Sequence, residues 1–150
     1  MTESAKRVYL DVCTLCRPFD DQAQMRIRLE TEAVQLILSH VRSGNLLLIV
    51  SPVHDIEIRA IDNPIEREHL LSTLSEIGYR VVFDLRRVRQ RAEELSEEGP
   101  GSADAAHLAF AEATVASFVT CDDRLIRQCR RVQPDVWCGS PVAFCSEENL

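Results

Sequence analysis

Short apolar runs alternate along the chain with longer segments that are apolar on one side only. The runs Val8–Leu10, Leu46–Val50 and Ser117–Cys121 predict strands, and their lack of polar alternation is typical of strands covered on both faces. Weaker runs predict two more strands, over Arg80–Phe83 and Val136–Cys138. Because strands alternate with helical segments, we expect an α/β fold with a central parallel sheet of four to five strands and helices on both faces.

Amphipathic periodicity marks the helices between these strands. In the first helical segment, Val34, Ile37 and Val41 recur at the spacing of one helix face. Capping and breaking residues set most boundaries, since Ser or Asn before Pro begins a helix and Gly ends one. The predicted helices cover residues 22–42, a segment that starts at Ser51-Pro52, residues 64–78, residues 86–98, a segment capped by Ser102 and residues 124–131.

The length of 150 residues is that of one domain rather than two, and we expect residues 1–150 to form it. No apolar run approaches the roughly 18 residues of a membrane span. The polar start, Met1–Arg7, leads directly into a strand and leaves no room for a signal peptide. We therefore expect a cytoplasmic protein.

The net charge of −7 argues against a protein that binds nucleic acid over its whole surface. Sixteen of the seventeen basic residues are nevertheless Arg, which binds carboxylates and phosphates with two parallel hydrogen bonds. They cluster over Arg86–Arg91 and over Arg124–Arg131. Each cluster is open to two interpretations, a salt-bridged surface or a site that positions a phosphate backbone.

The six cysteines do not indicate a disulfide framework, because the chain is too large for one and lacks secretory features. We expect reduced thiols at Cys13, Cys16, Cys121, Cys129, Cys138 and Cys145. The spacing of the first two is that of a redox dithiol or half a zinc site. No second Cys-x-x-Cys completes a zinc site, so packing thiols are the expected outcome.

Four acids follow the predicted strands or begin the predicted helices. Asp11 ends the first strand, Asp122 ends the Ser117–Cys121 strand, Glu57 lies on the helix after the second strand, and Asp104 lies in a first helical turn. If the first strand and the Ser117–Cys121 strand are neighbours, all four can converge at one sheet edge. Converging carboxylates repel one another unless a cation such as Mg²⁺ or Mn²⁺ lies among them, and such centres hydrolyse phosphodiesters.

Each acid also has an ordinary interpretation. Asp104 and Asp122 are favourable to the dipoles of the helices that they precede or begin. Glu57 would be unremarkable as a solvated acid on a helix. Asp11 is the hardest to explain in this way, because it directly follows a buried strand.

The local context of the acids is similar to that of a known family. Four stretches carry the resemblance: Val8–Asp11, Ser51–Ile58, Ser102–Ala109 and Phe118–Leu125. In order and spacing they resemble the PIN-domain family, in particular the VapC-like toxin ribonucleases, from residue 8 to about residue 140.

The resemblance implies a PIN-like three-layer sandwich and a ribonuclease that cleaves single-stranded RNA with Mg²⁺ or Mn²⁺. The metal-binding and catalytic acids of the family carry over to Asp11, Glu57, Asp104 and Asp122. Three of them would hold the cation, and Glu57 would be a further ligand or would orient the attacking water. The resemblance also implies a homodimer and a small antitoxin as partners, for which the helices over residues 22–42 and 65–78 offer surfaces.

Departures from the family pattern leave alternatives open. Many members have Ser or Asn two residues after the first acid, where this chain has Cys13, a poorer hydrogen-bond partner. A PIN-like binding or regulatory module with weak or no catalysis is therefore the second interpretation, and a structure-specific DNA nuclease is a third. Arg17 could pair with an acid near the site, or Asp20 and Asp21 could cap the next helix. His107, three residues after the third acid, could contact a phosphate or pack in the core.

Overall fold

Five parallel strands form the sheet of the computed structural model, which describes residues 5–150. The strands are β1 Lys6–Leu10, β2 Leu46–Val50, β3 Gly78–Arg80, β4 Ser117–Val119 and β5 Cys138–Gly139. Their order across the sheet is β3-β2-β1-β4-β5. The structure confirms the predicted α/β class with a central parallel sheet.

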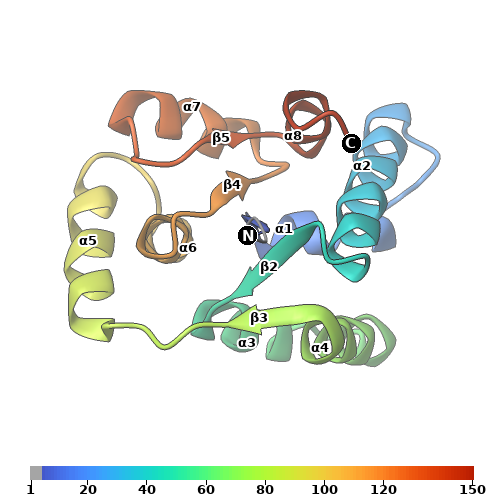
Figure 1. Ribbon diagram of the computed structural model, residues 1–150, viewed down its shortest axis with the longest axis horizontal. Helices are drawn as coiled ribbons and strands as arrows, with labels where there is room; N and C mark the ends of the chain where they lie inside the picture. Colours follow the sequence, from blue (N-terminus) through green and yellow to red (C-terminus); the bar gives the residue numbers. More distant parts are fainter. Residues whose placement is uncertain (1–4) are drawn as a thin grey trace.

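Helices cover both faces of this sheet (Figure 1). They are α1 Val12–Leu15, α2 Met25–Arg42, α3 Pro52–Arg59, α4 Pro64–Ile77, α5 Leu85–Glu97, α6 Ser102–Ala113, α7 Asp123–Val132 and α8 Pro141–Glu147, with a 3-10 turn over Arg17–Phe19. Helices α2, α4 and α8 lie on one side of the sheet, and α5 and α6 lie on the other (Figure 1). None of the helices among residues 5–150 is long and apolar enough to cross a membrane.

Alternate residues of each strand supply two separate cores, because side chains of a strand point to opposite faces in turn. Val8 and Leu10 pack with α2, α4 and α8, whereas Tyr9 packs with α5, α6 and α7. Strand β2 repeats the pattern, with Leu48 on the first face and Ile49 on the second. All of these side chains are buried, so the apolar runs of the sequence belong to strands that are covered on both faces.

The third strand was predicted at Arg80–Phe83, and that prediction was wrong by about two residues. Strand β3 begins at Gly78, directly where α4 ends. A Cβ at Gly78 would lie 2.4 Å from the Leu74 carbonyl oxygen and 2.5 Å from Val50, so glycine is what lets this strand start so close to the helix. Beyond it the chain leaves the sheet, and Phe83 packs against Phe110 instead.

Other boundaries differ less. Helix α2 starts at Met25 rather than Gln22, and Ser102 is the first residue of α6 instead of its cap, which is Gly101. The last strand is Cys138–Gly139 rather than Val136–Cys138. The short helix α1 and the C-terminal α8 were not predicted.

The strand order places the switch in winding direction between β1 and β4. From β1 the chain continues to β2 and then β3 on one side, while β4 and β5 lie on the other side. Leu10 is aligned with Val119, so the two strands end side by side. In open parallel sheets the crevice beyond the strand ends at such a switch point is where ligands bind. The residues that follow β1 and β4 are therefore the first to inspect.

Candidate active site

Asp11 lies at the switch point, directly after β1, and it is buried. Its Oδ1 accepts hydrogen bonds from the Thr14 backbone N–H at 3.2 Å, from the Thr14 hydroxyl and from the Cys13 thiol at 3.3 Å. Its Oδ2 accepts one from the Thr120 hydroxyl at 2.6 Å. Four donors therefore fix the carboxylate, and the first of them makes Asp11 the N-cap of α1.

Threonine side chains connect Asp11 to the end of β4. The Thr120 hydroxyl, which donates to Asp11, also accepts from the backbone N–H of Asp122 at 3.1 Å. The Thr14 hydroxyl likewise accepts from the backbone N–H of Cys121 at 3.0 Å. This double connection sets the position of the loop that carries Asp122. Thr120, two residues before Asp122, thus has a structural role in placing this loop.

Asp122 is the N-cap of α7, and its Oδ1 accepts from the backbone N–H groups of Arg124 and Leu125 at 2.9 and 3.3 Å. Asp122 therefore stabilises the start of α7, in line with its ordinary interpretation as an acid favourable to the helix dipole. Capping occupies one carboxylate oxygen and leaves Oδ2 without a hydrogen bond among the residues that the structure describes. Since Asp122 is exposed, a ligand beside the switch point can reach that oxygen.

Asp104 lies within electrostatic reach of the other three acids. It lies in the first turn of α6 and is partly buried. Burial raises the pKa of its carboxyl group, the negative charges of Asp11 and Asp122 raise it further, and His107 offsets part of this rise, with Glu57 contributing least. Since α6 is separated in sequence from the other acids, only the fold can bring these charges together.

Glu57 is held differently, by a buried histidine on α6. The Nε2 of His107 is hydrogen-bonded to Glu57 Oε1, and this bond holds the pKa of Glu57 below its usual value. On the other side of the ring, His107 Nδ1 lies 2.5 Å from the Tyr9 hydroxyl, which lies 2.7 Å from the Ser51 hydroxyl. Burial raises the pKa of Tyr9 well above 10, so the phenol keeps its proton.

The sequence offered two interpretations of His107, contact with a phosphate or packing in the core. The structure places it in the core, 2% exposed, where it bridges Tyr9 and Glu57. The helical spacing between Asp104 and His107 indicated that the two share a helix face. It did not reveal Glu57 as the partner, because that contact joins residues 50 positions apart.

A second buried histidine supports the end of β1. His54 Nε2 donates to the Leu10 carbonyl oxygen at 2.7 Å, while its Nδ1 accepts from the Ser51 backbone N–H at 3.0 Å. Burial lowers the pKa of His54 to about 3, with a further contribution from His107. The neutral ring therefore fixes the residue that precedes Asp11.

The Cys13 thiol lies within the site, but it donates a hydrogen bond to Asp11 as a serine would. Its pKa is raised, first by desolvation and then by the charge of Asp11, so the thiol remains protonated. All six cysteines are free, in agreement with the expected reduced thiols.

Arg17 does pair with an acid, although not with one of the four. Its guanidinium lies 3.0 Å from Asp20 and 3.2 Å from the buried Glu30. Asp21 accepts from the backbone N–H of Ala23, and neither Asp20 nor Asp21 caps α2.

The acids fit a hydrated cation better than a tightly enclosed one. Within residues 5–150, no group of three or more His, Cys, Asp or Glu side chains is close enough to hold a metal ion as it stands. The carboxylates nevertheless raise the pKa of Asp104 from several sides. Mg²⁺ keeps several of its waters and needs only one or two direct carboxylates. The donor set, all oxygen and locally anionic, suits that mode of binding.

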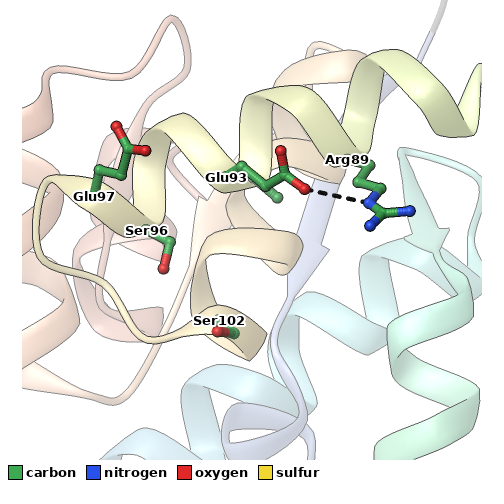
Figure 2. A pocket seen from close by; sticks show the side chains of 6 residues that line it. Arg89, Glu93, Ser96, Glu97 and Ser102 are labelled. Atoms are coloured by element: carbon green, nitrogen blue, oxygen red, sulfur yellow. Dashed lines mark hydrogen bonds and ion pairs between the residues drawn. The ribbon is translucent and has the colours of Figure 1, made fainter.

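Another hollow, of about 410 Å³, lies between α5 and the start of α6 and is lined by Arg89, Glu93, Ser96, Glu97 and Ser102 (Figure 2). Its arginine donates to Glu93 on the same helix at 3.2 Å. It contains none of the four candidate acids, and its one arginine is already paired with Glu93. The switch point remains the candidate active site.

Comparison with known proteins supports the fold alone. No family model matches the sequence, and no curated protein sequence matches it either. Among solved structures, the crystal structure of FitAcB from Neisseria gonorrhoeae is similar, with a TM-score of 0.55 over 90% of this chain and 98% of that one, at 15% sequence identity. The chain therefore has the PIN-like α/β sandwich that the sequence resemblance implied.

Proposed function

We propose that the protein is a metal-dependent endoribonuclease of the PIN type that cleaves single-stranded RNA. The observation that carries the proposal is the placement of Asp11 and Asp122 after the neighbouring strands β1 and β4, with Asp104 near enough for their charges to contribute to the raised pKa of its carboxyl group. The similarity to FitAcB and the position of the acids at the switch point support it. The motif resemblance supplies the substrate class.

The acids would divide the chemistry between them. Asp11, Asp104 and Asp122 would hold Mg²⁺ or Mn²⁺, which lowers the pKa of bound water and offsets charge that develops on the phosphate. Thr14 and Thr120 keep the Asp11 carboxylate in one orientation. Because His107 holds one oxygen of Glu57, that residue would use its other oxygen to orient a water.

The partners are proposed on the same resemblance. We expect the protein to be the toxin of a type II toxin–antitoxin pair, to form a homodimer and to bind a small antitoxin. Helix α2 exposes Met25, Leu29 and Leu36, and the exposed Val142 of α8 lines a hollow with the first two, which supports the first of the two predicted docking helices. Molar mass measured by light scattering tests the dimer.

The direct test of the nuclease is RNA cleavage with and without metal. The protein should cleave a single-stranded RNA in Mg²⁺ or Mn²⁺ and stop in EDTA. Asp11→Asn should reduce cleavage by at least about 1,000-fold while the circular dichroism spectrum stays native, since a neutral amide cannot bind the cation as a carboxylate does. Arg59→Gln, an exposed substitution on α3, is the control that should leave cleavage unchanged.

Two results would contradict the proposed nuclease mechanism. Cleavage that persists in Asp11→Asn would exclude this residue from the mechanism. A wild-type protein that binds RNA and never cleaves it in either metal would favour the second interpretation, a PIN-like binding or regulatory module.

A further inference from the structure

The two arginine clusters of the sequence differ in the structure. On α5, Arg87 lies 3.5 Å from Asp84, Arg89 lies 3.2 Å from Glu93, and Arg91 lies 3.0 Å from Glu112. Those guanidinium groups are neutralised by neighbouring carboxylates, as Figure 2 shows for Arg89. The salt-bridged interpretation holds for three of the four arginines of this cluster, because Arg86 has no carboxylate oxygen within 4.0 Å among residues 5–150.

The second cluster, on α7, has no such partners. None of its four arginines lies within 4.0 Å of a carboxylate oxygen among residues 5–150. These residues are Arg124, Arg127, Arg130 and Arg131. In a protein of net charge −7, a row of cations without carboxylate partners is a local exception. It leaves α7 with guanidinium groups available to an external anion.

Two of these arginines line a groove together with the sole tryptophan of the chain. Arg127 and Arg130 lie on the side of α7 that meets Trp137, Gly139 and Ser140 around a hollow of about 570 Å³, here called the α7 groove. A Cβ on residue 139 would lie 2.5 Å from the indole, so glycine allows the ring to pack over the edge strand. The indole also contacts Phe144, with ring centroids 5.7 Å apart, and this contact helps to fix its position.

The α7 groove begins beside the candidate active site. Helix α7 starts directly after Asp122, and Ser140 follows the carboxyl end of β5, so both walls reach the edge of the sheet where the acids lie. Of the residues that line the groove, one is acidic, Asp123. Arg26 already binds its carboxylate with two hydrogen bonds, at 2.8 and 2.7 Å. The groove therefore presents the charges of Arg127 and Arg130.

We propose that the α7 groove binds the RNA strand as it leaves the acidic site, with phosphates on Arg127 and Arg130 and one base stacked on Trp137. Arginines that track a backbone beside an aromatic ring are the general means by which proteins hold single-stranded nucleic acid. An acidic peptide could use the arginines but has no planar base for the indole. The inference rests on the proposed function for its substrate, and it adds where the strand lies.

Trp137 makes the proposal directly measurable, because it is the only fluorophore of its kind in the chain. A single-stranded RNA of roughly ten nucleotides, within the usual site size, is titrated into the full-length protein in EDTA so that no cleavage occurs. Binding is followed by anisotropy of a labelled RNA and by Trp fluorescence. Stacking of a base should quench the Trp emission, whereas inorganic polyphosphate should leave it unchanged.

Matched double substitutions then separate the two clusters. Arg127→Gln with Arg130→Gln should weaken RNA binding by about 10-fold or more and reduce the slope of log K against log salt by about 1.4, the value for two lost phosphate contacts on a single strand. Arg87→Gln with Arg89→Gln removes the same charge from α5. That control should change the affinity less than about 2-fold, because those arginines are already paired.

Several results would overturn the proposal. They are RNA binding that leaves the Trp emission unchanged, equal quenching by polyphosphate, equal weakening by both pairs of substitutions, and absence of RNA binding in the wild-type protein. The nuclease proposal is tested separately by Asp11→Asn in metal. Cleavage that depends on Asp11, together with unchanged Trp emission on RNA binding, would refute the α7 groove as the RNA-binding site and leave the nuclease proposal standing.

Discussion

On one side of the candidate active site, three carboxylates are brought together without a cationic side chain among them. On the other side, a carboxylate is held by a buried network of histidine, tyrosine and serine. We call these the acidic half, made of Asp11, Asp104 and Asp122, and the histidine half, made of His54, Glu57 and His107. The pKa of Asp104 is raised, whereas the pKa of Glu57 is lowered.

The two carboxyl groups have opposite pKa shifts because their surroundings differ. Asp104 is partly buried beside other negative charges, both of which disfavour its ionised form and outweigh an opposing effect of His107. Glu57 meets a hydrogen-bond donor from His107, which favours its ionised form. Opposite shifts among neighbouring titratable groups are the usual sign of separate roles in acid–base chemistry. The carboxylates of the acidic half therefore repel one another until a cation binds, whereas the Glu57 carboxylate of the histidine half already has a hydrogen-bond partner in His107.

The largest effect on stability should come from removing the His107 side chain from the histidine half. His107→Ala removes the bridge between Tyr9 and Glu57 and leaves a cavity. The expected cost is about 2–4 kcal/mol of unfolding free energy, since a buried polar partner and a buried side chain are lost together. Urea denaturation at neutral pH measures it.

Two further variants separate the hydrogen bonds from packing. His107→Gln keeps a donor that can reach Glu57 and should recover part of the loss. Tyr9→Phe keeps the ring and removes only the hydroxyl group, so it should cost about 1 kcal/mol. If His107→Gln and His107→Ala are equally unstable, the bond to Glu57 contributes nothing, and the contrast between the two halves is lost.

A pH dependence should come from the other buried histidine. His54 has a pKa of about 3 in the folded protein, below its value in the unfolded chain, so the unfolded chain binds more protons between those values. Stability contributed by neutral His54 is therefore complete above about pH 6.5 and declines as the pH falls toward 3. Between pH 6 and pH 4 the expected loss is about 2–3 kcal/mol.

The measurement is urea denaturation at several pH values for the wild type and for His54→Gln, which cannot titrate. The variant should be less stable at pH 7, yet its stability should depend less on pH than that of the wild type. His69→Gln, at an exposed position on α4, is the control. If both variants change the pH dependence equally, burial of His54 does not cause it.

The sequence predicts the acidic half much better than the histidine half. Asp11 and Asp122 follow apolar strands, and a parallel sheet brings the ends of neighbouring strands together, so their proximity follows from pattern and topology. Strand Leu46–Val50 was predicted at its observed bounds for the same reason. The bond between Glu57 and His107 depends on how two helices cross above the sheet, which no local periodicity encodes.

The misplaced third strand has a comparable cause. Val81 and Phe83 are apolar and read as strand residues, but the sheet is entered earlier, at Gly78, because a glycine there can approach Val50 and Leu74. Val82, between them, is 98% exposed. The ends of an edge strand such as β3 are therefore set by tertiary contacts, which the local pattern of apolar residues does not encode.

The smallest expected effect is also the sharpest test of the comparison, because its sign differs between the halves. Asp104 has a raised pKa, so its carboxylate is penalised in the folded protein above that pKa, and the penalty disappears at low pH. Glu57 has a lowered pKa, so it adds stability above its unfolded value of about 4.3 and loses it as the pH falls. Neutral amides at the two positions should therefore act oppositely at pH 7.

Asp104→Asn should raise stability in EDTA by about 1 kcal/mol, since it relieves repulsion among the acids. Glu57→Gln should lower it by about 0.5–1 kcal/mol, reduced by solvent screening because a third of that side chain is exposed. Both differences should shrink at about pH 3, where the unfolded carboxyl groups are protonated. Glu66→Gln, in the first turn of α4, is the control for helix-dipole effects and should cost about 0.3–1 kcal/mol.

Thermal melting with and without Mn²⁺ completes this test. The wild type should gain stability from Mn²⁺, because a ligand that binds only the folded state stabilises it. Asp104→Asn should lose most of that gain, whereas Glu57→Gln should retain most of it, because His107 already occupies one oxygen of Glu57. If Asp104→Asn is instead less stable in EDTA and gains as much from Mn²⁺ as the wild type, Asp104 serves only its helix. The acidic half would then not be a cation site, and the nuclease proposal would lose its physical basis.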